Sequence, residues 1–286
     1  MARAGSVNPS FDAPLNYLEH RLPGLATWAY DPPDGSPRFN GRLHAVSTTI
    51  ADARGLPRHG DVDLHGFTLL ERPSAVADFW DDAQVRDIYY REAAGWIARA
   101  LGAEHVVVFD HTCRRRAAHR PPLDGVGGSF STVREPVGRV HADFTLVSGP
   151  MRVQPLLEAE GGRVLPDFRI VGLWRPLATA ALQDAPLALA AVDSVAPDDL
   201  VPNAIVYPQR RGETYAVLHN PRHRWYYYPR MTSDEAILFL HYDSRQMAAG
   251  EGRAHAGTVP HTAFEEPGTP VDAAPRQSIE LRALVW

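Results

Sequence analysis

The chain has 286 residues, of which 44% are hydrophobic and 22% are charged, an ordinary globular composition with enough material for a substantial core. All 29 basic residues are arginines and the formal net charge is -5, which argues against nucleic acid or an anionic membrane surface as a partner. The single cysteine, Cys113, excludes an intramolecular disulfide, and no apolar run approaches a membrane span, so we expect a cytoplasmic protein.

The first 60 residues are rich in Pro, Gly and Asp. They predict an extended arm that packs on the body of the protein, because Pro fixes φ and removes backbone donors. Residues 61–286 are then expected to form a single domain. Early in this domain, Ser74 is a typical helix N-cap and predicts a helix to about Asp81. Apolar residues at helical spacing predict a second helix from 82 to 101.

After the second helix the pattern changes from helix to strand. The apolar run Val106–Phe109 predicts a buried strand that ends at Asp110–Thr112. Residues 114–137 are polar and rich in Gly and Pro, which predicts a long loop that serves as a lid or faces the substrate. It begins with three arginines, Arg114–Arg116, whose simplest interpretation is solvated loop charge. For the neighbouring Cys113 we favour an unreactive, half-buried thiol over a nucleophile.

Further short apolar or alternating runs follow at fairly even spacing, with turn residues between them. Short strands in this pattern predict a mainly β sandwich or barrel with flanking helices, and a double-sheet jelly roll is one such closure. The run at 235–241 fits either a strand or a short helix, and we choose a strand. The strands predicted along the whole chain, besides that at 106–109, cover residues 44–50, 66–70, 168–175, 186–195, 214–218, 225–228, 235–241, 262–264 and 278–286.

One strand end carries a pair of groups that can bind a metal ion. His141 and Asp143 are separated by one residue, so their side chains share a face of the strand and can occupy two adjacent coordination positions. With a second His they form the ligand set that suits ferrous iron and leaves positions open for substrates. The pair alone is a weak signal, because it also occurs by chance in surface loops. Asp110 and His111 would join the site if their strand neighbours this one.

A second His must complete the set, and sequence separation alone does not choose it. His261 opens a short strand and is followed by Arg276 and Ser278, which share a face of the last strand. A guanidinium matches a carboxylate with two parallel hydrogen bonds, and a hydroxyl adds a donor. Arg282 competes with Arg276 for this role, and we expect it to need a partner other than Glu280. The other candidate ligands are His219, His223, His241 and His255.

Six motifs taken together resemble the iron(II)/2-oxoglutarate-dependent oxygenases, and more narrowly their CmcJ/NvfI group. They run in order over roughly residues 60–286, which is most of the chain. As a set they are far more specific than any single member. The motifs are Val108–Thr112, His141–Thr145, Trp174–Pro176, Trp225–Pro229, Pro260–Phe264 and Arg276–Arg282.

The resemblance implies a double-stranded β-helix, the jelly-roll or cupin-like core of that superfamily. It implies His141, Asp143 and His261 as Fe(II) ligands, with Arg276 and Ser278 holding the distal carboxylate of 2-oxoglutarate. Members of the group hydroxylate, desaturate or cyclise secondary metabolites, so the implied partners are a small-molecule substrate and dioxygen. The stretch between Asp143 and His261 is longer than in many relatives, which keeps His219 and His241 open as ligands.

Two alternatives use the same residues. A non-heme iron dioxygenase or oxidase would work without 2-oxoglutarate and would place Arg276 on a carboxylate of its substrate. An accessory protein in a biosynthetic complex would turn over no substrate. The sequence leaves open the substrate, the outcome of the reaction, and whether the chain is a monomer or a homodimer.

Overall fold

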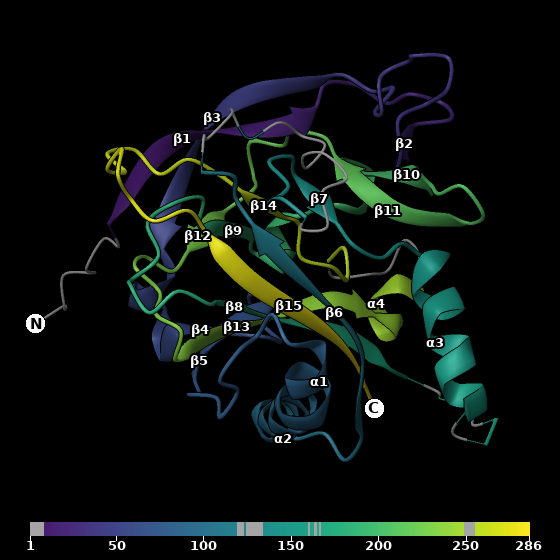
Figure 1. Ribbon diagram of the computed structural model, residues 1–286. Helices are drawn as coiled ribbons and strands as arrows, with labels where there is room; N and C mark the ends of the chain where they lie inside the picture. The colour runs from purple at the N-terminus through teal and green to yellow at the C-terminus, as the bar shows by residue number, and fades with distance from the viewer. Residues whose placement is uncertain are drawn as a thin grey trace, which may run out of the picture.

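The structure is a computed structural model, and it describes residues 9–118, 123, 134–159, 161, 162, 165, 167–248 and 255–286. Two β-sheets face each other and enclose the core (Figure 1). Among the described residues, no helix is both long enough and apolar enough to cross a membrane. The mainly β architecture with flanking helices agrees with the expectation from the strand pattern.

The larger sheet has nine strands within the described ranges, in the spatial order β1-β3-β12-β9-β14-β7-β11-β10-β2. Most neighbours run antiparallel, while β12 pairs with β3, and β10 with β2, in parallel. The strands are β1 Ser10–Leu18, β2 Ala26–Trp28, β3 Leu43–Asp52, β7 His141–Ala142, β9 Leu187–Ala190, β10 Leu200–Val206, β11 Arg211–Val217, β12 Trp225–Tyr227 and β14 His261–Ala263.

The smaller sheet is antiparallel, in the order β4-β5-β13-β8-β15-β6. The last strand of the chain lies inside this sheet, because β15 pairs with β8 on one side and with β6 on the other. The strands are β4 Gly60–Asp61, β5 Phe67–Glu71, β6 Val106–Arg115, β8 Arg169–Pro176, β13 Glu235–Asp243 and β15 Gln277–Val285.

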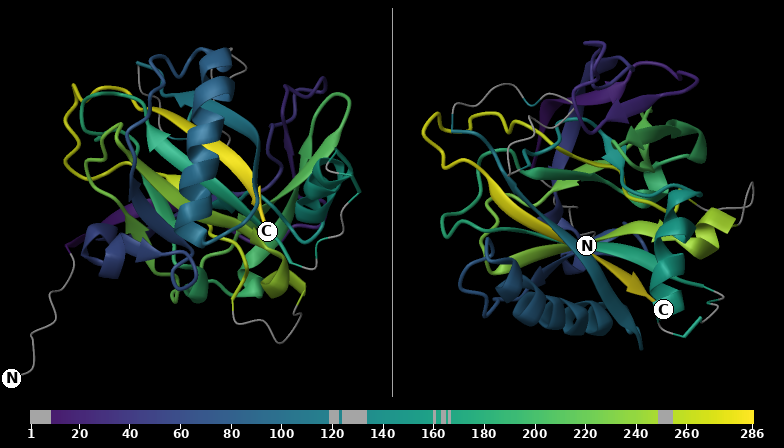
Figure 2. Two further views of the ribbon diagram at one scale, coloured as in Figure 1. Left: turned by 90° about the horizontal axis from the view of Figure 1, so that it is seen from below. Right: turned by 45° about the vertical axis from the view of Figure 1, so that its right-hand side comes forward.

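A continuous helical segment covers the outer face of the smaller sheet (Figures 1 and 2). Its residues Tyr89 and Ile97 are fully buried and pack in one cluster with Ile279 and Leu281 of β15. Gly102 ends the segment in the left-handed conformation, which glycine adopts without strain. The helices are α1 Asp82–Gln84, the π-turn η3 Val85–Tyr89, α2 Tyr90–Leu101, α3 Ser148–Ala159 and α4 Ser244–Ala248, with 3-10 turns at Ala53–Gly55, Pro57–His59, Val192–Ser194 and Pro197–Asp199.

The helix predicted from Ser74 to Asp81 is wrong, whereas the helix predicted from 82 to 101 is confirmed. Ser74 donates its hydroxyl to Glu92 of α2 at 2.5 Å. The backbone N–H groups of Ala77 and Asp78 donate to the side chain of Gln84. The segment therefore satisfies its donors with side chains of the helical segment beside it, and no helix of its own is required.

Two elements differ from the sequence prediction beside the site. Strand β6 does not end at Asp110–Thr112 but continues to Arg115, because it pairs with β15 along its whole length. Helix α3 was not predicted from the sequence, because it contains proline, which is unfavourable inside a helix. Its first turn is capped by Thr145, whose hydroxyl accepts from the N–H groups of Val147 and Ser148. Most of the predicted loop 114–137, including residues 119–122 and 124–133, lies outside the described residues.

One glycine shapes the inner face of the smaller sheet. The pairing of β13 shifts between Leu240 and Tyr242, so His241 sits at a bulge. Gly172 lies on the neighbouring β8, where an added Cβ would come 2.5 Å from Nε2 of His241 and 2.7 Å from the ring of Phe239. The missing side chain lets His241 reach across β8 to Glu280 on β15, with Nε2 3.1 Å from Oε1.

We expect Gly172→Ala to lower the free energy of unfolding by about 1–3 kcal/mol, because the methyl group would displace buried rings. Gly95→Ala is the matched control. Gly95 is exposed on α2 with nothing within 4 Å of an added Cβ, so the same change should stabilise by about 0.5–1 kcal/mol. Urea unfolding of both variants measures the difference, and equal stability of Gly172→Ala and the parent would contradict this account.

Candidate metal centre

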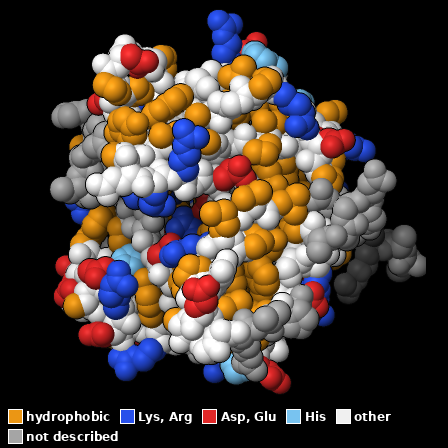
Figure 3. All heavy atoms as spheres, turned by 90° about the vertical axis from the view of Figure 1, so that its right-hand side faces the viewer, with side chains coloured by type: hydrophobic (Ala, Val, Ile, Leu, Met, Phe, Trp, Pro, Cys, Tyr) orange, Lys and Arg blue, Asp and Glu red, His pale blue; other side chains and the backbone are white. Residues whose placement is uncertain are grey.

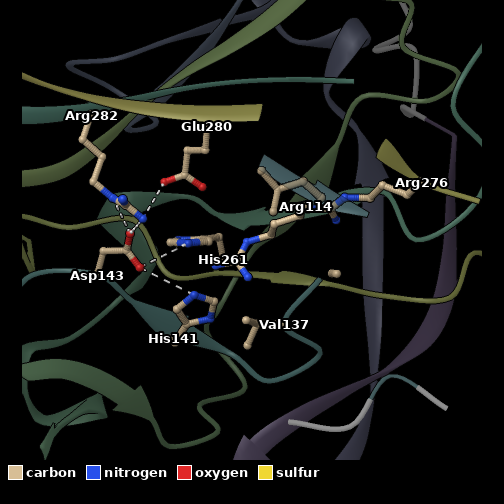
Figure 4. A pocket seen from close by; sticks show the side chains of 10 residues that line it. Arg114, Val137, His141, Asp143, His261, Arg276, Glu280 and Arg282 are labelled. Atoms are coloured by element: carbon tan, nitrogen blue, oxygen red, sulfur yellow. Dashed lines mark hydrogen bonds and ion pairs between the residues drawn. The ribbon is translucent and has the colours of Figure 1, made fainter. Parts of the chain in front are cut away.

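A pocket between the two sheets gathers the residues that the sequence singled out (Figure 4). The larger sheet contributes His141 on β7 and His261 on β14, which are direct cross-strand neighbours. Asp143 follows β7 immediately. The smaller sheet faces them with side chains of β6 and β15. The lining residues are Arg114, Val137, His141, Asp143, Leu187, His261, Ala263, Arg276, Glu280 and Arg282.

The triad of His141, Asp143 and His261 has the geometry of a metal site. Their ligand atoms all lie within 4.8 Å of one another. Nε2 of His141 is 3.6 Å, and Nε2 of His261 is 3.9 Å, from Oδ1 of Asp143. Each ring donates its Nδ1–H to a backbone carbonyl, of Arg139 at 2.9 Å and of Val259 at 3.0 Å. This bond fixes the tautomer, so each Nε2 presents a lone pair toward the carboxylate.

Electrostatics gives the triad the protonation state that a metal requires. Burial lowers the pKa of His141 to about 3 and also lowers the pKa of His261. Burial alone would raise the pKa of Asp143, but the Arg282 cation and the histidines around it hold that pKa well below its usual value. At neutral pH the site therefore offers two neutral imidazoles and one carboxylate, which fits ferrous iron with open positions.

Arg282 determines which oxygen of Asp143 is free. Its Nε donates to Oδ2 at 2.9 Å and its Nη2 lies 2.8 Å from the same oxygen, which leaves Oδ1 facing the two histidines. Arg282 also lies 3.4 Å from Glu280 and 3.1 Å from Asp110. The expectation that Arg282 would not pair with Glu280 was wrong, because residues two apart on a strand share a face and long side chains can meet there.

The structure distinguishes the alternative histidines. His241 is fully buried beside Asp143, and with Glu280 these residues form a second group of ligand atoms within 4.8 Å. However, the Arg282 cation lies against both carboxylates of that group, which disfavours a metal ion there. His219 packs edge-on against Tyr17, with ring centroids 5.1 Å apart, and does not line the pocket. His261 is therefore the best placed partner for His141 and Asp143.

Arg276 and Ser278 lie together, as their spacing predicted. Arg276 donates its Nε to the Ser278 hydroxyl at 3.1 Å and its Nη1 to the Ala185 carbonyl at 2.8 Å. Its guanidinium lies over the ring of Trp174, 4.9 Å from the centroid. Burial, together with the nearby Arg114 cation, lowers the pKa of Arg276 to about 9, so it stays charged at neutral pH.

The remaining predicted residues lie on the two faces of β6, and Asp110, His111 and Cys113 do not line the pocket. Asp110 accepts from Arg282 and so supports the triad indirectly. His111 faces the helical segment, with Nδ1 2.9 Å from the Tyr90 hydroxyl. Cys113 donates to the Phe79 carbonyl, and burial raises its pKa to about 11, so at neutral pH it is the unreactive thiol that we favoured. Sequence reasoning missed Arg114 and Glu280 as pocket residues, although the period-two alternation of Glu280 with Arg276 and Ser278 was visible.

Comparisons with known proteins agree with this geometry. Residues 15–286 match a family described as an oxidoreductase/YMDC permease-like domain. The chain is 30% identical to the hydroxylase/desaturase efuI of Hormonema carpetanum, over 99% of this chain and 97% of that protein. It is 32% identical to the Fe(II)/2-oxoglutarate-dependent dioxygenase nvfI of Aspergillus novofumigatus, over 87% of this chain and 85% of that protein.

The chain belongs to the NvfI-like group of the iron(II)/2-oxoglutarate-dependent oxygenase superfamily. A solved structure of the iron and alpha-ketoglutarate-dependent endoperoxidase NvfI matches this NvfI-like chain with a TM-score of 0.82 and 26% identity, covering 97% of this chain and 98% of the other. The match extends over both sheets, so the predicted double-stranded β-helix is confirmed.

Arg282→Lys should weaken metal binding about 10- to 100-fold, because a lysine keeps the charge but loses the guanidinium contacts of Nε and Nη2 that turn Oδ1 of Asp143 toward the histidines. Arg152→Lys is the control, since Arg152 bonds the same Asp110 but does not contact Asp143. Anaerobic titration of Co(II), followed by its visible absorption, measures both affinities. Unchanged affinity in Arg282→Lys would show that the arginine does not orient the carboxylate.

Proposed function

We propose that this protein is an iron(II)/2-oxoglutarate-dependent oxygenase that oxidises a small-molecule secondary metabolite with dioxygen. In this proposal His141, Asp143 and His261 hold the iron, while Arg276 and Ser278 hold the distal carboxylate of 2-oxoglutarate. One observation carries it: two neutral imidazoles direct Nε2 at a single oxygen of Asp143, in a pocket that also contains Arg276. The relatives, whose names include hydroxylase, desaturase, dioxygenase and endoperoxidase, support this reaction class.

When bound, iron(II) and 2-oxoglutarate supply dioxygen activation coupled to decarboxylation of the keto acid to succinate. The chain supplies the geometry. Backbone carbonyls of Arg139 and Val259 fix the two imidazole rings, and Arg282 keeps Asp143 ionised and oriented. Apolar side chains among the pocket-lining residues, such as Leu187, limit water near the reacting centre.

Hydrophobic side chains next to the site suit an apolar small molecule. Leu146, Val147 and Met151 follow the triad carboxylate closely in sequence and are 45%, 57% and 66% exposed. Figure 3 shows the face that carries α3, where hydrophobic side chains gather beside a hollow that contains charged ones. Apolar walls with a few polar groups are typical of small-molecule sites.

Three further expectations belong to this proposal. The cytoplasmic location follows from the single cysteine, and a homodimer stays a prediction. The proposed arm of residues 1–60 contributes β1 and β3, which pair with each other along their length and join the larger sheet through β12. This placement supports an arm that packs on a single domain of residues 61–286.

Anaerobic addition of Fe(II) and then 2-oxoglutarate to the metal-free protein should produce a visible metal-to-ligand charge-transfer band. His261→Ala should abolish the band and iron binding, because two ligands alone hold iron weakly. His219→Ala, the control, should keep both, since His219 packs on Tyr17 outside the pocket. Bound iron without a band would indicate an oxidase or dioxygenase that does not use 2-oxoglutarate, and no iron binding at all would favour the accessory role.

A further inference from the structure

We propose that Arg114 is a second carboxylate-binding residue of the pocket and shares the distal carboxylate of 2-oxoglutarate with Arg276. This inference rests on the proposed function and extends it to a residue outside the sequence motif. Arg114 lies in the run Arg114–Arg116, whose simplest interpretation from sequence was solvated loop charge. The structure instead places Arg114 on β6, lining the pocket together with the triad.

The strand register puts Arg114 next to the Arg276–Ser278 pair. In the antiparallel pairing of β6 with β15, Arg114 stands directly opposite Ser278, so the two side chains share a sheet face. The same ladder pairs Asp110 with Arg282 at the end where Asp143 lies. Arg114 therefore belongs to the end of the pocket away from the Asp143 contact. Figure 4 shows its side chain reaching between the triad and Arg276.

Arg114 and Arg276 are the pocket arginines that make no ion pair with a carboxylate in the described part of the chain, and Glu280 acts on both only at longer range. Arg282 has Asp143, Glu280 and Asp110 around it. Among the described residues, the Arg114 guanidinium donates to the backbone carbonyl of Glu135, at 2.8 Å, and the Arg276 guanidinium donates to a hydroxyl and a carbonyl. A guanidinium withdrawn from water is costly without an anion, so the buried Arg276 and the half-buried Arg114, which face one cavity, favour an anionic ligand between them.

The hydrogen bonds that the two guanidinium groups already make show why Arg276 alone is not enough to bind both oxygens of a carboxylate. A planar fork needs two free N–H groups on one edge of the guanidinium. In Arg276, Nε is bonded to Ser278 and Nη1 to Ala185, so both edges that could form a fork are partly occupied. In Arg114 Nη1 is bonded to Glu135, and the Nε–Nη2 edge, which bonds to no other described residue, is left for a carboxylate. Together the two residues can satisfy both carboxylate oxygens.

The test compares two keto acids that differ only at the distal end. 2-Oxoglutarate and 2-oxopentanoate are titrated anaerobically into the Fe(II)-loaded protein, and the charge-transfer band reports each affinity. Arg114→Gln should weaken 2-oxoglutarate binding about 10- to 100-fold, as expected for loss of hydrogen bonds to a charged group. It should change 2-oxopentanoate binding by less than about twofold, because that ligand has no distal carboxylate. Arg114→Lys should recover part of the loss.

Arg115→Gln is the matched control. Arg115 is the next residue on β6 but faces outward, with its guanidinium 4.2 Å from the ring centroid of Trp80, and neither affinity should change. Binding of 2-oxopentanoate also reports that Arg114→Gln is folded and holds iron. Equal weakening of both keto acids, or of neither, would overturn the role assigned to Arg114. If the parent protein itself gives no band with 2-oxoglutarate, the proposed function fails first, and this inference fails with it.

Discussion

The ion pair between Asp143 and Arg282 joins the two sheets at the site, and the site depends on it. Asp143 follows β7 of the larger sheet, whereas Arg282 lies on β15 of the smaller one. Without a cation, burial would favour the protonated acid, which is a poor metal ligand. The Nε hydrogen bond and the Nη2 contact keep Asp143 ionised and also determine which oxygen faces His141 and His261. One contact thus sets both the charge and the orientation of the proposed ligand.

Arg282 is itself held by a network that extends across three strands. Glu280 lies two residues away on β15, and His241 reaches it from β13 over Gly172 of β8. Burial alone would raise the pKa of Glu280, but Arg282 and the hydrogen bond from His241 lower it to about 2. The bulge at His241 and the glycine opposite are therefore not defects of the sheet. They are the backbone features that let a buried carboxylate support Arg282.

The sequence was sufficient for the features that follow from strand periodicity. His-x-Asp and Arg-x-Ser each place two groups on one face, and the structure brings these residues together in and around the pocket. The sequence could not predict which residues of neighbouring strands stand opposite one another. Strand β6 looks as if it ends at Asp110 because polar residues begin there, yet the strand continues to Arg115 in register with β15, and its Arg114 lines the pocket. The place of Arg114 beside Ser278 follows only from the register of β6 with β15, and no local pattern encodes that register.

The β6–β15 register places Arg114 in the pocket, and the charge of Arg114 bears on which ligand the pocket binds. Three arginines and two carboxylates line it, while the two histidines of the triad are neutral, so positive charge is in excess by one before any metal binds. Iron(II) would add two more positive charges. A doubly charged keto acid lowers the resulting excess of three to one, whereas a singly charged one leaves two positive charges uncompensated in a medium where charge is costly. The arginines that give the ligand-free pocket its excess positive charge are thus the groups that would select a dianionic co-substrate over simpler keto acids.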